Sequence, residues 1–348
     1  MTAETANNAD TEPRGSAPLP FLTSQKPLAE AYDTALLDLD GVVYRGAEAV
    51  PHAAEALRAA HEHGMRRAYV TNNASRTPET VAEHLTELGV PAAVTEVVTS
   101  AQAAARMAVA CVGEGGRVLV IGGDGLMAAV RELGLKPVAS ADDMPDIVVQ
   151  GYSPDLGWKD LAEATYAVRR GVTWIATNTD TTVPTSRGIA PGNGTLVAAV
   201  QAASGKIPQV AGKPELPLHR ESILRSGATR PLIVGDRLDT DIEGAVRGNT
   251  DSLLVFTGVT TARDLLAAPA DRRPSYLAED LRGLLTPHVA PIRDGVNFVS
   301  ARWTAAVVSE QVVLHGHGDK MDALRAMCAA VWDYGKPVDM EDALASLA

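Results

Sequence analysis

The sequence predicts an α/β fold, in which a doubly wound parallel sheet carries an inserted α/β domain and is followed by a small α+β element. Three observations favour this fold class. Short apolar runs alternate with helical stretches at the beginning and again late in the first 274 residues, as in parallel sheets covered by helices on both faces. A second, separate alternation occupies residues 91–206. The length of 348 residues also favours more than one domain.

The first 27 residues show no pattern of a helix or a strand. They mix small, polar and proline residues, without the basic start and apolar centre of a secretory signal. We therefore expect residues 1–27 to form a disordered tail and the ordered chain to begin near Leu28.

The main sheet is predicted in two parts of the chain, residues 28–90 and 207–274. The apolar runs "TALLDLD" and "RRAYVTNN" precede helical stretches in the first part, and "RPLIVGD" and "DSLLVFTG" stand in the second. Strands that are buried on both faces by crossover helices have such continuous apolar runs. These two parts therefore form one core domain that is interrupted in sequence.

The interrupting segment, residues 91–206, has its own strands and helices. The runs "RVLVIGG", "DIVVQGY" and "VTWIATNTD" alternate with the helical stretches "GLMAAVRELG" and "LAEATYAVRRG". This is enough for an independent small α/β domain. Residues 275–348 then change character, with a predicted hairpin in "VNFVSARWTAAVVSEQVVLHGHG" and a helix in "DKMDALRAMCAAVWDYG".

Composition restricts the class of partner and the compartment. The net charge of -12 and the pI near 5.1 argue against nucleic acid and anionic membranes, because phosphate contacts need clustered Lys and Arg. No apolar run has the length of a membrane span. The two cysteines, Cys111 and Cys328, stand far apart, which fits a reducing compartment. We expect a cytoplasmic protein with a small-molecule substrate, and we leave a homodimer open.

Polar side chains that carry chemistry follow the apolar runs of the core. In an open parallel sheet the carboxyl ends of the strands share one edge, and ligands bind in the crevice there. The residues in question therefore converge in space although they are distant in sequence: Asp38, Asp40, Thr71, Asn72, Asn73, Lys213, Asp236 and Asp241.

This set of residues suits phosphoryl transfer. The acids can hold Mg²⁺, which usually also contacts a substrate phosphate, and Lys213 and Thr71 can bind the other phosphate oxygens. Asp38 can attack phosphorus to give an aspartyl phosphate. Asp40 stands two residues on along a strand and so points to the same side; it can protonate the leaving oxygen and later deprotonate water.

Four motifs in order, "DLDGVVYRG", "VTNN", "GKPE" and "VGDRLDTD", resemble those of the haloacid dehalogenase (HAD) superfamily, in its NagD-like or p-nitrophenylphosphatase-like branch. The resemblance implies a Rossmann-like core and a Mg²⁺-dependent phosphatase. It implies that Asp38 is the nucleophile, Asp40 the acid and base, and Lys213 the balancing cation.

The same resemblance implies the remaining site residues. The metal ligands would be the Asp38 carboxylate, the main-chain carbonyl of Asp40 and the Asp236 carboxylate, with Gly41, Gly235 and Asp241 in support. The phosphoryl group would be bound by Thr71, Asn72 and Asn73, together with Lys213.

The inserted domain stands between the second and third motifs, because a long segment separates Thr71 from Lys213. In the superfamily this position corresponds to a C2 cap, a roof over the active site that favours small phosphorylated metabolites. We expect glycerol 3-phosphate or a similar short phosphate ester, because Thr181, Thr182 and Val183 offer no aromatic surface for a ring. The alternatives are phosphoglycolate, sugar, nucleotide or pyridoxal phosphate, a phosphomutase, or a ligand-sensing protein without catalysis.

Single motifs also have structural interpretations. Asp38 and Asp40 are compatible with a turn at a strand end, residues 71–73 with capping of the next helix, and Asp239 and Asp241 with capping of the helix after them. The ordered set of four motifs favours the catalytic interpretation for all of these except Asp239.

The C-terminal segment "VVLHGHGDKMDALRAMCAAVW" is similar to the strand, Gly-x-Gly and helix that bind acyl-CoA pyrophosphate in GNAT-type acetyltransferases. Val313 replaces the Gln or Arg that leads this loop in that family. The segment is also too short for a complete transferase. We therefore expect a GNAT-like appendage for packing, dimer contact or effector sensing.

Overall fold

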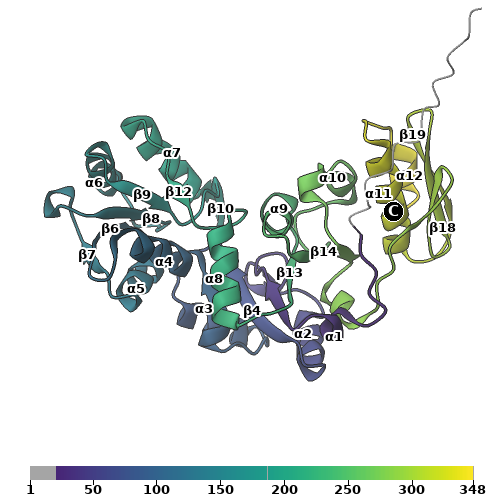
Figure 1. The fold of residues 1–348 in the computed structure, drawn as a ribbon, viewed down its shortest axis with the longest axis horizontal. Helices are drawn as coiled ribbons and strands as arrows, with labels where there is room; N and C mark the ends of the chain where they lie inside the picture. The colour runs from purple at the N-terminus through teal and green to yellow at the C-terminus, as the bar shows by residue number, and fades with distance from the viewer. Residues whose placement is uncertain (1–20, 186, 348) are drawn as a thin grey trace, which may run out of the picture. The chain divides into compact units, whose positions relative to one another are not determined.

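The computed structural model describes residues 21–185 and 187–347. It contains two compact units, which divide between Ala290 and Pro291. Figure 1 labels their helices and strands. Each unit has its own β-structure and its own buried apolar residues, so we describe each by itself.

The core of the first unit is a six-stranded sheet with the order β15-β14-β13-β1-β4-β5. All neighbouring strands are parallel. The strands are β1 (Thr34–Leu37), β4 (Arg66–Thr71), β5 (Val97–Thr99), β13 (Pro231–Gly235), β14 (Asp251–Val255) and β15 (Tyr276–Ala278). The strand order reverses between β1 and β13, which confirms the doubly wound fold and places the ligand crevice at the carboxyl ends of these two strands.

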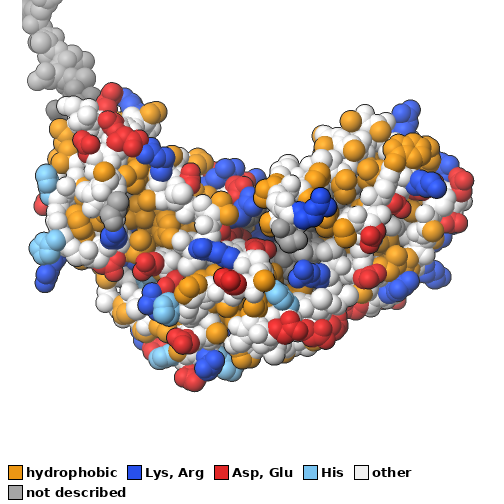
Figure 2. All heavy atoms as spheres, turned by 180° about the vertical axis from the view of Figure 1, so that it is seen from behind, with side chains coloured by type: hydrophobic (Ala, Val, Ile, Leu, Met, Phe, Trp, Pro, Cys, Tyr) orange, Lys and Arg blue, Asp and Glu red, His pale blue; other side chains and the backbone are white. Residues whose placement is uncertain are grey.

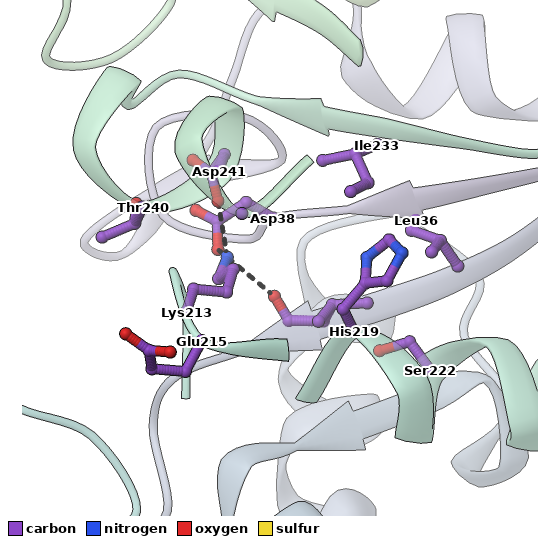
Figure 3. Close-up of a pocket in the computed structure, with 11 residues that line it drawn as sticks. Leu36, Asp38, Lys213, Glu215, His219, Ser222, Ile233, Thr240 and Asp241 are labelled. Carbon is purple, nitrogen blue, oxygen red and sulfur yellow. Dashed lines mark hydrogen bonds and ion pairs between the residues drawn. The ribbon is translucent and has the colours of Figure 1, made fainter. Parts of the chain in front are cut away.

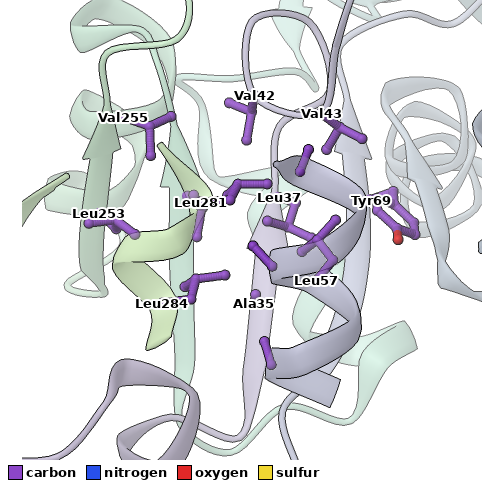
Figure 4. Close-up of a cluster of buried hydrophobic side chains, with 14 of the residues drawn as sticks. Ala35, Leu37, Val42, Val43, Leu57, Tyr69, Leu253, Val255, Leu281 and Leu284 are labelled. Carbon is purple, nitrogen blue, oxygen red and sulfur yellow. The ribbon is translucent and has the colours of Figure 1, made fainter. Parts of the chain in front are cut away.

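Strand β1 is buried along its whole length, with an apolar cluster on each face of the sheet. Leu37 packs with Leu57, Leu281 and Leu284 on one face (Figure 4), whereas Leu36 belongs to the apolar cluster on the other face. The core helices are α1 (Leu28–Ala31), α2 (Ala53–Glu62), α3 (Pro78–Glu87), α4 (Ser100–Val112), α8 (Leu216–Ser226), α9 (Glu243–Arg247) and α10 (Ala262–Leu266). A small antiparallel pair, β2 (Tyr44–Arg45) and β3 (Glu48–Ala49), follows the β1 loop.

Local signals explain where two of these helices begin. The Thr77 hydroxyl accepts from the Thr80 N–H at the start of α3, where Pro78 occupies the first turn. At the start of α4 the Thr99 hydroxyl accepts from Gln102, and the Gln102 side chain accepts from the Thr99 N–H. Both helices therefore begin at the residue type that caps free N–H groups.

The inserted domain is a second parallel sheet with the order β12-β9-β8-β6-β7. Its strands are β6 (Arg117–Ile121), β7 (Lys136–Val138), β8 (Ile147–Gln150), β9 (Thr173–Ala176) and β12 (Gln209–Val210). Its helices are α5 (Asp124–Glu132), α6 (Trp158–Arg169) and α7 (Asn193–Ser204). An antiparallel hairpin of β10 (Thr182–Thr185) and β11 (Gly188–Pro191) precedes α7.

The boundaries between the core sheet and the inserted sheet differ from those predicted from the sequence. Strand β5 lies in the core sheet although it follows residue 91, and β12 lies in the inserted sheet although it follows residue 206. Strand β15 belongs to the core sheet although it follows residue 274. These strands have only two or three residues, too few to show the periodicity on which the boundaries depend.

Residues 21–27 are ordered, which corrects part of the predicted tail. Phe21 is buried, Ser24 pairs with His288, and the Leu22 N–H donates to the Ser275 carbonyl. The isolated apolar residues of this stretch carry no periodic pattern, so the contacts became visible only in the fold. Residues 1–20 of the predicted tail lie outside the described residues.

The second unit is a four-stranded antiparallel sheet with the order β16-β17-β18-β19. Its elements are β16 (Ile292–Asp294), β17 (Asn297–Ser300), β18 (Trp303–Val308), β19 (Gln311–Gly316), α11 (Lys320–Tyr334) and α12 (Glu341–Ala345). Helix α11 packs on β17 and β18 and buries Phe298, Ala305 and Met327. This is the hairpin and helix that the sequence predicts.

The surface drawn in Figure 2 mixes acidic, basic and hydrophobic side chains, and Lys and Arg do not gather there into one continuous patch. Among the helices of residues 21–185 and 187–347, none combines the length and the hydropathy that crossing a membrane requires.

Candidate active site

The candidate site lies at the carboxyl ends of β1, β4 and β13. Asp38 directly follows β1, Thr71 ends β4 and Asp236 directly follows β13. Lys213 comes from the loop between β12 and α8, and its side chain points at Asp38 and Asp241 (Figure 3). The structure therefore brings together residues of all four motifs. Asp38, Thr71 and Asp236 meet at the shared edge of the parallel core sheet, and Lys213 joins them from the loop that leaves the inserted sheet.

The ammonium group of Lys213 is surrounded by oxygen atoms. Nζ forms ion pairs with the Asp38 carboxylate and with Asp241 Oδ1 at 2.7 Å, and it donates to the Val70 carbonyl at 3.4 Å. Burial lowers the pKa of Lys213, but Asp241 and Asp38 outweigh burial and hold the pKa above its usual value. The lysine therefore remains a cation beside Asp38.

Three carboxylates form a cluster around this lysine. Asp38, Asp236 and Asp241 each offer an oxygen atom, and these atoms lie within 4.8 Å of one another. Burial raises the pKa of Asp38 despite the nearby lysine, and burial followed by the charge of Asp241 raises the pKa of Asp236 to about 6. One lysine does not balance the charge of three acids, of which Asp236 and Asp241 are buried and Asp38 is partly buried.

Asp236 in particular has the environment of a cation ligand. It is fully buried, and its Oδ2 accepts from the Val259 N–H at 2.7 Å. Its Oδ1 has no hydrogen-bond partner among the described residues. A buried carboxylate oxygen without a partner is costly, whereas carboxylate oxygens are the ligands that Mg²⁺ prefers. The cluster therefore fits a divalent cation.

Two glycines allow the backbone to approach this cluster. Gly41 has φ +84°, and a Cβ there would lie 2.6 Å from Asp236 Oδ2. A Cβ on Gly258 would lie 1.8 Å from the same oxygen. Gly235, also expected to support the site, stands against Asp241, where a Cβ would lie 2.2 Å from the Asp241 Cβ. Gly258 is a site residue that the sequence reasoning missed, although it follows an apolar run as the others do.

Asp40 lies apart from the lysine and its carboxylates. Its side chain is more accessible than that of Asp38, and among the described residues Lys213 pairs with Asp38 and Asp241 but not with Asp40. Partial burial raises the pKa of Asp40, against the opposing effects of the Gly46 N–H, Arg76 and His84. A raised pKa suits a carboxyl group that donates a proton.

Thr71 and Asn73 form a turn at the end of β4. The Thr71 hydroxyl oxygen accepts from the Asn73 N–H at 3.0 Å. Asn73 Oδ1 accepts from the N–H and from the hydroxyl of Ser75, each at 2.8 Å. The Asn73 side chain thus stabilises the loop, whereas the hydroxyl hydrogen of Thr71 has no acceptor among the described residues.

Asn72 contacts the backbone of Lys213. Its Oδ1 accepts from the Lys213 N–H at 2.8 Å, and its Nδ2 donates to the Lys213 carbonyl at 3.2 Å. The same Nδ2 donates to Asp180 Oδ2 at 3.3 Å. The Asn72 amide is therefore engaged in hydrogen bonds to other protein groups, although the sequence predicts that it binds the phosphoryl group.

Residues of the inserted domain take part in this arrangement, and sequence reasoning missed them. The Asn72 carbonyl accepts from Nδ2 of Asn178, a residue of the inserted domain, at 2.7 Å, and from the hydroxyl of Ser100, at the start of core helix α4, at 2.5 Å. Asn178 and Asp180 directly follow β9. The rule that polar residues after parallel strands converge, applied to the second sheet, is the signal that points to them.

A small cavity beside Lys213 is lined by Asp38 and Asp241 and by apolar residues that include Leu36 and Ile233 (Figure 3). It measures about 20 Å³, which is room for about one water molecule rather than a phosphate ester. His219 lines this cavity and its Nε2 lies 3.0 Å from the Thr250 hydroxyl. The cavity therefore backs the site and does not receive the substrate.

Comparisons with known proteins agree with this geometry. A model of haloacid dehalogenase-like hydrolases matches residues 35–136, and a second HAD-hydrolase-like model matches residues 210–284. A model of a GCN5-related N-acetyltransferase-like domain matches residues 301–347. The sequence thus carries the HAD motifs on both sides of the inserted domain and a GNAT-like segment after them.

Two curated relatives are phosphatases. The D-glycerol 3-phosphate phosphatase of Mycobacterium tuberculosis is 42% identical over 321 residues, which cover 88% of each chain. An acid sugar phosphatase of Staphylococcus haemolyticus is 37% identical over 253 residues, 72% of this chain and 94% of the relative.

A solved structure is similar over most of its length. The crystal structure of the M. tuberculosis glycerol phosphate phosphatase in complex with magnesium has a TM-score of 0.83 at 42% identity, and covers 90% of this chain and 94% of that chain. These findings confirm the predicted fold class, the predicted phosphoric monoester hydrolase and the GNAT-like segment. The chain belongs to the haloacid dehalogenase-like hydrolases.

Proposed function

We propose that this chain is a Mg²⁺-dependent phosphatase that hydrolyses glycerol 3-phosphate or a similar short phosphate ester through an aspartyl phosphate. The observation that carries the proposal is the position of Lys213 between Asp38 and Asp241, beside the buried carboxylate of Asp236. The identity of 42% with a D-glycerol 3-phosphate phosphatase supports the substrate.

The carboxylates of Asp38 and Asp236 and the carbonyl of Asp40 would hold Mg²⁺, with Asp241 close to them. When bound, the ion would neutralise part of the phosphate charge and so reduce its repulsion by the carboxylates. The unpartnered Oδ1 of Asp236 supports this assignment. The magnesium complex of the relative from M. tuberculosis supports the choice of metal.

In the first step an oxygen of the Asp38 carboxylate attacks phosphorus. The new bond joins this oxygen to phosphorus, and the bond between phosphorus and the alcohol oxygen breaks. Asp40 gives its proton to the leaving oxygen, a role that the raised pKa of Asp40 favours. Lys213 keeps positive charge beside Asp38, where the phosphate dianion must approach.

In the second step water attacks the phosphorus of the aspartyl phosphate. Asp40, now a carboxylate, takes the proton of this water. The bond between phosphorus and the Asp38 oxygen breaks, which releases inorganic phosphate and restores both carboxyl groups. The hydroxyl hydrogen of Thr71 and the ammonium of Lys213 would bind the phosphoryl oxygens in both steps.

The hairpin after β9 bears on the choice of alcohol. Thr181, Thr182 and Val183 stand just after Asp180, which contacts the core through Asn72. These side chains provide hydroxyl groups and one small apolar surface, which suit a polyol better than an aromatic ring. Sugar phosphates are the second candidate, because the acid sugar phosphatase shares 37% identity.

The experiment is phosphate release from a panel of esters with Mg²⁺, for the wild type and Asp38→Asn. The panel should contain glycerol 3-phosphate, sugar phosphates, phosphoglycolate, pyridoxal phosphate and nucleotides. We expect the highest kcat/KM for glycerol 3-phosphate and loss of activity in the variant. Undiminished turnover by Asp38→Asn would contradict the covalent mechanism, and inactivity toward all esters would favour a ligand-sensing role.

We also infer a cytoplasmic location and no nucleic-acid partner, from the sparse cysteines and the net charge of -12. We further propose that the chain forms a homodimer. Analytical ultracentrifugation of the full chain measures this oligomeric state directly.

A further inference from the structure

Asn72 makes two hydrogen bonds to one residue, and that residue is Lys213. Asn72 Oδ1 accepts from the Lys213 N–H at 2.8 Å, and Nδ2 donates to the Lys213 carbonyl at 3.2 Å. The Lys213 Nζ is held separately by Asp38 and Asp241. The main chain of Lys213 is thus held by Asn72 of the second motif, and its ammonium group is held by two carboxylates.

Asp180 completes the orientation of the Asn72 amide. Asp180 Oδ2 accepts from Asn72 Nδ2 at 3.3 Å, which leaves Oδ1 of the amide facing the Lys213 N–H. If the amide turned over, its carbonyl oxygen would face the Asp180 carboxylate and the Lys213 carbonyl. Two acceptors on the amide nitrogen and one donor on the amide oxygen therefore specify the orientation of this side chain.

The loop that carries Asp180 is itself anchored on Asn72. Asn178 Nδ2 donates to the Asn72 carbonyl at 2.7 Å, and Asn178 Oδ1 accepts from the Asp180 N–H at 3.2 Å. Asn193 Nδ2 in turn donates to the Asn178 carbonyl at 2.7 Å. Asn178 and Asn193 are almost fully buried. The loop of Asp180 is therefore held by a buried network of hydrogen bonds in the inserted domain.

The backbone before the lysine leaves no spare room. A Cβ on Gly212 would lie 2.6 Å from Asn72 Oδ1 and 2.6 Å from the Thr177 carbonyl. The loop of Lys213 is therefore packed between Asn72 of the core and the end of β9 in the inserted domain. A small movement of either neighbour would displace the lysine.

We propose that Asn72 is a positioning residue that holds the main chain of Lys213, and that Asp180 of the inserted domain holds Asn72 in the required orientation. The proposal rests on the proposed phosphatase function. It assigns to Asp180 an effect on the phosphoryl chemistry through Asn72 and Lys213, without contact with the substrate.

The first experiment measures the kinetics of Asp180→Ala and Asn72→Asp. Losing a hydrogen bond to a charged group commonly costs about tenfold or more in rate, so we expect kcat to fall about tenfold in Asp180→Ala. The fall in Asn72→Asp should be larger, because a carboxylate would then face both Asp180 and the Lys213 carbonyl. KM should change little. The fall in kcat should be equal for glycerol 3-phosphate and p-nitrophenyl phosphate, since the lysine acts on the phosphoryl group that both share.

A second, reciprocal variant tests the pairing itself. In Asn72→Asp combined with Asp180→Asn, the amide at position 180 donates to the carboxylate at position 72. We expect kcat to recover at least threefold relative to Asn72→Asp alone. The matched control is Asp155→Ala, an exposed acid of the same inserted domain, which should retain wild-type kcat.

A third measurement does not depend on catalysis. The Lys213 N–H donates to Asn72 Oδ1, so amide hydrogen exchange at Lys213 should become faster in Asp180→Ala and remain unchanged in Asp155→Ala. Unchanged exchange and a kcat within twofold of the wild type in Asp180→Ala would overturn the proposal. A loss confined to KM, or one that differs more than tenfold between the two esters, would also overturn it, because Asp180 would then contact the leaving group.

The exchange measurement also distinguishes a failure of the positioning proposal from a failure of the proposed phosphatase function. If the wild type and Asp155→Ala release no phosphate from either ester, the proposed function fails while the positioning of Lys213 is still measured. If Asn72→Asp does not fold, Asp180→Asn replaces it, since it keeps an acceptor for Asn72 and leaves no void. We expect kcat to fall at least twofold in Asp180→Asn, and wild-type kcat and exchange there would contradict the proposal.

Discussion

Lys213 Nζ donates to Asp241 Oδ1 at 2.7 Å, so that the lysine of the third motif is tied to an acid of the fourth. Asp241 is almost fully buried, and its side chain also accepts from the Arg237 N–H at 3.2 Å. The acid thus links the loop after β13 to the loop before α8. The position of the Lys213 ammonium group therefore depends on Asp241 as well as on Asp38.

Replacing Asp241 should therefore weaken the lysine's position. We expect Asp241→Asn to lower kcat about 10- to 100-fold, because a charge-assisted hydrogen bond becomes a neutral one. The matched control is Asp239→Asn, which removes an exposed acid whose partner is Arg237. An exposed pair contributes about 0–1 kcal/mol, so this control should lie within threefold of the wild type. Equal kinetics for both variants would contradict the role of Asp241.

Stability of the metal-free protein should fall as the pH rises from about 4 to about 6. Burial raises the pKa of Asp236 to about 6, above the value of about 3.9 in an unfolded chain. The native state therefore binds more protons than the unfolded state in this window, and its stabilising contribution is lost as pH rises through the folded pKa. The measurement is the free energy of unfolding in urea with EDTA, for the wild type and Asp236→Asn.

The slope should be smaller in Asp236→Asn, because the amide does not titrate. Saturating Mg²⁺ should reverse the trend in the wild type, since metal binding displaces the proton and gains affinity as pH rises. A slope that is the same in both proteins would assign the pH dependence to other groups.

Gly258 should be required for metal binding. A Cβ there would lie 1.8 Å from Asp236 Oδ2 and 2.7 Å from the Asp236 Cβ, so Gly258→Ala must displace this carboxylate. We expect the Mg²⁺ concentration for half-maximal activity to rise about 10- to 100-fold, as for other residues that orient metal ligands. Gly157→Ala is the control, because a Cβ there has no atom nearer than 3.9 Å. Normal Mg²⁺ dependence in Gly258→Ala would refute the steric argument.

The end of the first unit can be tested by truncation. A chain that ends at Ala290 keeps all six strands of the core sheet. We expect it to unfold cooperatively in urea and to keep kcat within threefold of the full chain.

A chain that ends at Pro274 loses β15, together with the buried residues Tyr276 and Leu277. It also loses the contact of 2.9 Å between the hydroxyl groups of Tyr32 and Tyr276. Removing two large buried side chains costs several kcal/mol, at about 2–5 kcal/mol each, so this shorter chain should be insoluble or unfolded. If both truncated chains behave alike, the boundary at 290 is wrong.

Sequence patterns were sufficient for the fold class because it depends on local periodicity. Apolar runs between helical stretches identify parallel strands, and the family matches confirm the α/β core. The same patterns were insufficient for the exact boundaries. Strands β5, β12 and β15 have two or three residues each, and such strands are specified by the neighbours with which they pair.

For the residues of the site, too, the sequence pattern predicted one part and the tertiary structure decided the other. By itself the sequence determined that Asp38, Thr71 and Asp236 converge, because they stand at the carboxyl ends of parallel strands that share one edge. The sequence also predicted that Lys213 joins them, but the strand before it, β12, lies in the inserted sheet, so this edge does not account for its position. Only the tertiary structure decided which atoms meet. Asn72 turns to the Lys213 backbone, Asp180 reaches it from another domain, and Gly258 makes room for Asp236. The physical reason is that a hydrogen bond depends on distance and direction between distant segments, which no local pattern encodes.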